Sequence, residues 1–238
     1  LEHLLAAART ATVEGRPLVA LADGTLIRWM IRGMNNEAAE AQLIARYTEF
    51  LQAFQREALP LASYVSMPAT TEVVNLLRFV VGELEEPAPA GMDVTPEAPP
   101  LDGLLDRHVF DAVLGPGERS APFGSTSHIQ RSYPEGTEVF YFYLKVPGGT
   151  GGGEIGRVEV PRWVADDPAL LDRIHATVLR ECEKGEGYPL ALSEAHERAV
   201  IRGSEREAFF RLMERRLQRA GLSPTDSRKR RSKQRPRV

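Results

Sequence analysis

Apolar residues along the chain switch between helical spacing and short unbroken runs, a pattern typical of α/β proteins. Residues 17–23 read PLVALAD before Gly24, which predicts a buried strand, and residues 26–32 are compatible with its extension. Further strands are predicted for apolar and aromatic runs at 61–66, 138–146 and 155–160. Helices are predicted where apolar residues recur every three or four positions: 1–10, 37–58, 73–81, 107–114, 167–184, 193–201 and 204–220.

The order of these elements predicts an α/β domain with a mixed sheet flanked by helices. Two strand–helix units come first, followed by a pair of strands joined through the glycine-rich stretch 148–153. Residues 85–100 hold five prolines and little periodicity, so we expect a long surface loop there.

The composition indicates an ordinary globular protein, with 42% apolar and 26% charged residues among 238. The single cysteine, Cys182, excludes an internal disulfide and a cysteine-based zinc site, and it favours a reducing, cytoplasmic setting. No apolar run approaches the roughly 20 residues of a membrane-spanning helix, so we expect no membrane partner.

Charge is distributed unevenly along the chain. Residues 227–238 carry seven basic side chains and no acid, which leaves 23 of the 30 basic residues against all 33 acidic ones, a net charge of −10, in residues 1–226. We expect domain 1–226 to be followed by a disordered basic tail, 227–238. Such a tail suits contact with a polyanion, although a passive solubilising terminus has the same composition.

The motif G-x-G-x-x-G occurs at 151–156 as GGGEIG. Dinucleotide binding requires this turn to open a helix whose N-terminus holds the pyrophosphate. A predicted strand follows here instead, so we interpret the glycines as a hairpin loop and expect no dinucleotide cofactor.

Asp23, in Asp23-Gly24-Thr25, follows the first predicted strand. Side chains at this end of a strand line the ligand crevice of open α/β sheets, and a carboxylate there suits Mg²⁺ or Mn²⁺. An ordinary turn uses the same residues for their backbone preferences. Phosphatases of the haloacid dehalogenase type also carry DGT, but their nucleophilic aspartate lies two residues earlier, where this chain has Leu21.

Two other polar residues are candidates for chemistry. His196 lies in the first turn of a predicted helix, where the helix N-terminus favours a neutral ring that can act as ligand or base, unless it is simply a surface histidine. Asp102 and Asp106 are four residues apart, and capping of a helix is their alternative role. The five histidines show no zinc-binding spacing.

Four segments in this order resemble the C-terminal part of a bacterial NurA-type nuclease domain: PLVALADGTLIRW (17–29), LASYVSMPATTEVVNLLR (61–78), LLDRHVFDAVLGPGERSAPF (104–123) and GYPLALSEAHERAV (187–200). The resemblance implies an RNase H-like fold and a Mn²⁺-dependent (or Mg²⁺-dependent) 5′-to-3′ exonuclease and single-strand endonuclease. It also implies a homodimer that acts on DNA with a HerA-type hexameric ATPase, in end resection and double-strand break repair.

The resemblance assigns roles to individual residues. Asp23 matches the family's second strand-end aspartate, and His196 matches the histidine of its C-terminal helix. Glu2 is the best-placed match for an acidic residue on the preceding helix, and Asp106 occupies a recurrent polar position. It therefore implies Asp23, Glu2 and His196 as metal ligands, with Asp106 as a fourth candidate catalytic residue.

The chain departs from the family pattern at two places. The family's first metal-binding aspartate, in a DGSQ-like motif, would lie upstream of Leu1, so we expect an N-terminally truncated fragment. Met67 stands where a basic residue is expected. These departures keep a non-catalytic adapter for a DNA translocase open as an alternative, and a phosphomonoesterase is a third hypothesis.

Overall fold

The computed structural model describes residues 1–15, 17–28, 37–84, 101, 103–148 and 153–199, together with 209, 211–213, 215–216 and 219. The chain forms two compact units, Leu1–Glu194 and Ala195–Val238. The first unit contains all the described strands. In the second, the described residues are helical: the end of α7 (Leu190–Ala199) and short stretches beyond it.

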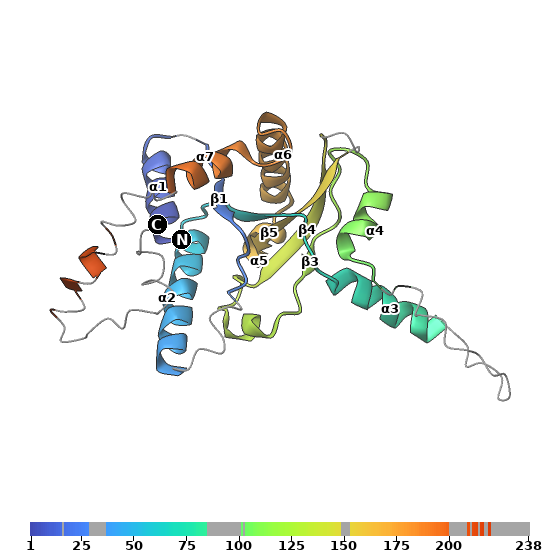
Figure 1. The fold of residues 1–238 in the computed structure, drawn as a ribbon, viewed down its shortest axis with the longest axis horizontal. Coiled ribbons are helices and arrows are strands. Elements are labelled where there is room, and N and C mark those ends of the chain that lie inside the picture. The colour runs from blue at the N-terminus through green and yellow to red at the C-terminus, as the bar shows by residue number, and fades with distance from the viewer. Residues whose placement is uncertain are drawn as a thin grey trace, which may run out of the picture. The chain divides into compact units, whose positions relative to one another are not determined.

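The first unit is built around a five-stranded mixed sheet (Figure 1), in the order β1-β2-β5-β4-β3. β1 (Ala20–Asp23) and β2 (Leu61–Ser66) are parallel. β5 (Glu154–Pro161) runs antiparallel to β2 and to β4 (Val139–Val146), and β4 also pairs with the short β3 (Phe123–Gly124). The parallel pair is connected through α2 (Glu37–Arg56), as a crossover connection requires.

Helices cover both faces of the sheet, and the alternation of side chains along β4 explains why. Phe142 and Leu144 point into a core with α5 (Arg162–Ala165) and α6 (Pro168–Lys184). Tyr141 and Tyr143 point the other way, into a core with α3 (Glu72–Leu84) and α4 (Asp106–Val113). A strand buried on both faces is apolar at nearly every position, which is the pattern of this segment.

A third core closes the β1 end of the sheet, where α1 (Glu2–Val13) and α2 pack. Leu5 of α1 and Leu51 and Phe54 of α2 contribute to it, together with Leu61 of β2. Each such apolar side chain contributes roughly 1.5–3 kcal/mol when fully buried. This packing fixes β1, and with it the turn that follows Asp23.

The mixed sheet with flanking helices confirms the predicted fold class and agrees with an RNase H-like α/β fold. The extension of the first strand through 26–32 was wrong for its described part, since residues 26–28 leave the sheet; residues 29–32 lie outside the described residues. The loop 85–100 and the tail 227–238 also lie outside them, as does most of 204–220. α5 was not predicted, because four residues carry no helical periodicity. Within the described residues, no helix combines the length and apolar character that a membrane crossing needs.

Candidate functional site

Asp23 is the last residue of β1, at the carboxyl end of the parallel pair. Gly24 follows with a φ of +75°, a conformation that glycine adopts without strain, so the chain leaves the sheet directly after the carboxylate. The Asp23 side chain is exposed. It therefore stands where open α/β sheets carry ligands.

One oxygen of Asp23 is held by a tyrosine from a distant segment. The Tyr188 hydroxyl donates a 3.0 Å hydrogen bond to Oδ1 of Asp23, and the Tyr188 ring packs edge-on against Tyr64 with 5.6 Å between centroids. Burial and the Asp23 carboxylate raise the pKa of Tyr188 to about 12, so this phenol is a donor at neutral pH. Among the described residues, nothing donates to Oδ2, which leaves that oxygen available to a ligand.

The other side of the same turn is held by Glu159 of β5. Its Oε2 accepts hydrogen bonds from the Thr25 hydroxyl and from the backbone N–H of Leu26, both at 2.8 Å. The Thr25 hydroxyl in turn accepts from the N–H of Ile27 at 2.9 Å. Since only 3% of the Glu159 side chain is exposed, these bonds form where water does not compete.

Arg157 neutralises part of the charge around Glu159. Its Nε lies 2.9 Å from Glu159 and its Nη1 lies 2.8 Å from Glu72 of α3, while the guanidinium stacks 3.6 Å from the centroid of the Tyr141 ring. Burial by itself lowers the pKa of Arg157, but the Glu159 and Glu72 carboxylates raise it above its ordinary value. The three side chains together carry a formal net charge of −1.

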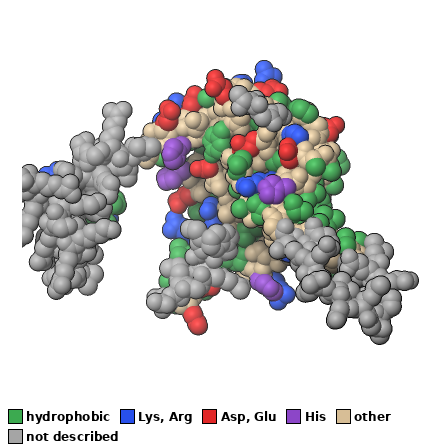
Figure 2. Space-filling model, turned by 45° about the vertical axis from the view of Figure 1, so that its right-hand side comes forward, with side chains coloured by type: hydrophobic (Ala, Val, Ile, Leu, Met, Phe, Trp, Pro, Cys, Tyr) green, Lys and Arg blue, Asp and Glu red, His purple; other side chains and the backbone are tan. Residues whose placement is uncertain are grey.

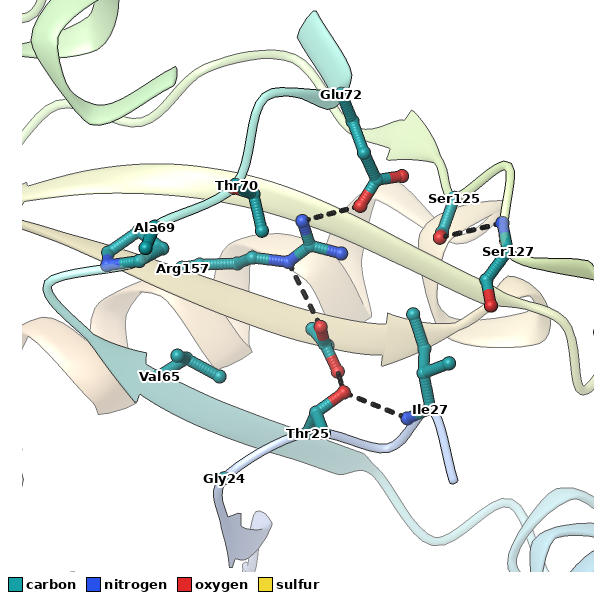
Figure 3. A pocket seen from close by; sticks show the side chains of 12 residues that line it. Gly24, Thr25, Ile27, Val65, Ala69, Thr70, Glu72, Ser125, Ser127 and Arg157 are labelled. Atoms are coloured by element: carbon teal, nitrogen blue, oxygen red, sulfur yellow. Dashed lines mark hydrogen bonds and ion pairs between the residues drawn. The ribbon is translucent and has the colours of Figure 1, made fainter. Parts of the chain in front are cut away.

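A pocket of about 480 Å³ opens beside this group of charges (Figure 3). It lies between the turn after β1, the segment leading into α3 and the loop after β3. Polar side chains of Thr25, Ser125, Ser127 and Arg157 line it together with apolar ones. Asp23 is not among the lining residues, so the pocket and the Asp23 carboxylate are separate features of one turn.

The contacts of Asp106 indicate a structural role. It is fully buried, its Oδ1 accepts from the N–H of Val74 in the first turn of α3 at 2.8 Å, and its Oδ2 accepts from the Tyr143 hydroxyl at 2.6 Å. It thus caps a helix other than its own. Because both oxygens are engaged inside the protein, we leave Asp106 out of the site proposed below.

Glu2 is not joined to Asp23 by any hydrogen bond or ion pair of the described residues, and His196 belongs to the second unit. Glu2 opens α1, and its carboxylate lies 2.7 Å from Arg46 of α2, with both side chains more than half exposed. His196 has an exposed side chain in the last turn of α7, so its predicted place in the first turn of a helix was wrong, because the helix begins at Leu190. In the part of the chain that the structure describes, no three His, Cys, Asp or Glu side chains are grouped to hold one metal ion. The described donors therefore do not fit a complete metal site.

Charged side chains of both signs are interspersed with apolar ones on the face drawn in Figure 2. Ion pairs of the described residues include Arg119 with Asp172 and Lys145 with Asp111.

Comparison with known families decides the assignment. Residues 1–201 match the model of the NurA domain, most of the chain. The chain belongs to the NurA family. This is a family of DNA repair nucleases, so the NurA domain here is of hydrolase type. Comparisons with curated proteins and with solved structures gave no match.

The residues around the NurA domain's Asp23 turn include three that sequence reasoning missed: Tyr188, Arg157 and Glu159. Arg157 and Glu159 alternate with valines in a strand buried on both faces, and two charges in such a strand signal a buried ionic network. Tyr188 follows a glycine and precedes Pro189 just before α7, a position without such a signal.

Proposed function

We propose that this protein hydrolyses phosphodiester bonds of DNA, acting as a 5′-to-3′ exonuclease and as an endonuclease on single strands. Family membership supports the nuclease class. The observation that carries the proposal is Asp23, an exposed carboxylate at the carboxyl end of a parallel strand with Oδ1 held by Tyr188 and Oδ2 available.

The chemistry of this carboxylate suits the reaction. Hydrolysis of a phosphodiester requires an oriented water and a way to neutralise the charge that develops on phosphate oxygens. Asp23 offers a fixed acceptor for a water or a hard cation, because Tyr188 limits its rotation. Mn²⁺ or Mg²⁺ is the proposed cofactor, and Asp23 is the residue that we propose to bind it.

The proposed partners follow from the family resemblance. We expect the protein to act on DNA ends in double-strand break repair in the cytoplasm, as a homodimer with a HerA-type hexameric ATPase. The basic residues of 227–238 are the proposed backbone contacts.

A non-catalytic adapter for a DNA translocase is the second candidate. The observation that favours it is that the described side chains do not form a metal site. An adapter binds the ATPase but leaves DNA intact with every divalent ion.

The experiment uses the product of the complete reading frame and DNA labelled at either end, with Mn²⁺, Mg²⁺ or EDTA. Shortening from the 5′ end with Mn²⁺, together with internal cuts in single strands, is the expected result. p-Nitrophenyl phosphate should stay intact, since its hydrolysis would indicate a phosphomonoesterase. Intact DNA with all ions, combined with retained ATPase binding, would replace the nuclease by the adapter.

A further inference from the structure

The pocket beside Arg157 has no role in the function proposed so far. Its volume of about 480 Å³ lies within the range of roughly 300–1,000 Å³ that small-molecule sites occupy. We propose that it holds one unpaired nucleobase of a single DNA strand. This inference rests on the proposed function for its substrate class, and on the pocket's own walls for its chemistry.

The pocket offers a hydrogen-bond donor that no described group uses. Nε and Nη1 of Arg157 bind Glu159 and Glu72, while Nη2 donates to nothing in the described part of the chain. Figure 3 shows this third nitrogen pointing toward the side of the pocket where Ser125 and Ser127 lie. Only 3% of the Arg157 side chain is exposed. The N–H groups of Nη2 are therefore buried donors that face the pocket.

An acceptor stands close to this donor. Glu72 keeps 24% of its side chain exposed, and among the described residues its Oε2 accepts only a 3.2 Å bond from the N–H of Thr126. The edge of every nucleobase carries at least one N–H donor and at least one acceptor, and their order differs from base to base. A donor beside an acceptor therefore suits a base edge without selecting one base.

The remaining walls suit the faces of a base. Ile27, Val65, Pro68 and Ala69 supply apolar surface, and the hydroxyl groups of Ser125 and Ser127 lie across the pocket from Val65 and Ala69 (Figure 3). A flat nucleobase can bury its faces against such apolar surface, and this contact does not distinguish one base from another.

Charge argues against a phosphate in the same space. The group of Arg157, Glu72 and Glu159 has a net charge of −1, so a second anion would be repelled, whereas a nucleobase is neutral. Thr25 lines the pocket two residues after Asp23, so a base bound there lies next to the turn that carries the proposed catalytic carboxylate.

The test compares a short oligothymidylate with an abasic oligonucleotide of the same length, both in EDTA so that neither is degraded. Phosphates are equal in the two probes, so any difference in affinity reports the bases. We expect the oligothymidylate to bind the full-length protein about tenfold more tightly, because one of its bases removes apolar surface from water in the pocket. Amide NMR signals of residues 25, 125 and 127 should shift with the oligothymidylate alone.

Two variants fill the pocket from opposite walls, Ser127→Phe and Ala69→Trp, and Thr126→Phe is the matched control, since Thr126 is exposed and outside the lining. Circular dichroism selects the folded variants. Either filling variant should abolish the difference between the probes, and the control should keep it. Equal binding of both probes by wild type, or a difference that survives in a folded filled variant, would overturn the proposal. No step of this test requires cleavage of DNA. The base-binding proposal can therefore be disproved while the nuclease proposal holds, and the nuclease proposal can be disproved while base binding holds.

Discussion

Glu159 of β5 reaches across β2 to bind Thr25, which follows β1: the Thr25 hydroxyl donates to Glu159 Oε2 at 2.8 Å. In β2, the strand between them, Ser63 is the residue that pairs with Glu159 across the antiparallel ladder. A small side chain at this position leaves the route across β2 open. The turn after Asp23 is thus tied to the centre of the sheet as well as to its own strand.

Removing either partner of this bond should destabilise the protein. We expect Glu159→Ala to cost at least about 3 kcal/mol, because it removes the acceptor of this bond and the buried ion-pair partner of Arg157, and Thr25→Val to cost about 1 kcal/mol. Urea unfolding of both single variants and the double variant gives the coupling energy, which should be about 1 kcal/mol. Additive effects would mean that Thr25 and Glu159 do not interact.

Tyr188→Phe removes the hydroxyl that binds Asp23 and keeps the ring that packs on Tyr64. A loss of about 0.5–1.5 kcal/mol in the free energy of unfolding is expected for one hydrogen bond to a partly exposed carboxylate. The same substitution in an Asp23→Ala background should cost nothing. An undiminished cost in that background would show that Tyr188 acts through other contacts.

Asp106→Ala tests whether this carboxylate is structural. It leaves the Val74 N–H and the Tyr143 hydroxyl without their shared acceptor, so a loss of about 2–3 kcal/mol is expected by urea unfolding. Asp111→Ala is the control and should cost less than about 1 kcal/mol, because the Asp111 carboxylate that pairs with Lys145 is exposed. If the Asp106→Ala variant folds with nearly unchanged stability but no longer cleaves DNA, Asp106 belongs to the catalytic site.

The main elements could be predicted because each has a local pattern. β4 is apolar on both faces, and α6 repeats apolar residues at helical spacing, so burial alone defines them. The position of Asp23 also followed from local features, an apolar run and a glycine. Its partners did not, since Tyr188 is 165 residues away and Glu159 is two strands away in the sheet. Asp106 shows the same limit, because the helix it caps begins 34 residues earlier, at Glu72.

Buried tyrosines should make stability depend on alkaline pH. Burial raises the pKa of Tyr47, Tyr64, Tyr141 and Tyr143 above the ordinary value of 10.0, and that of Tyr188 to about 12. A folded pKa above the unfolded one gives stability that is fully present below pH 10 and is lost as pH rises through the folded value.

The free energy of unfolding is therefore expected to stay level up to about pH 10 and to fall above it, with the Tyr188 contribution disappearing between pH 10 and 12. Urea unfolding at a series of pH values, together with the ultraviolet absorbance of tyrosinate, measures both quantities. Ionisation of all tyrosines near pH 10 in the folded protein would contradict the burial seen here.

The most direct test of the nuclease assignment is single-turnover cleavage of end-labelled single-stranded DNA, with Mn²⁺, by the full-length protein and its Asp23→Asn variant. Asp166→Asn is the control, because Asp166 is an exposed aspartate whose carboxylate pairs, among the residues that the structure describes, with Arg162 alone. We predict that Asp23→Asn lowers the cleavage rate at least about hundredfold without loss of folding or DNA binding, and that the control keeps the wild-type rate. Equal rates for wild type and Asp23→Asn would contradict the assignment of Asp23 to the active site.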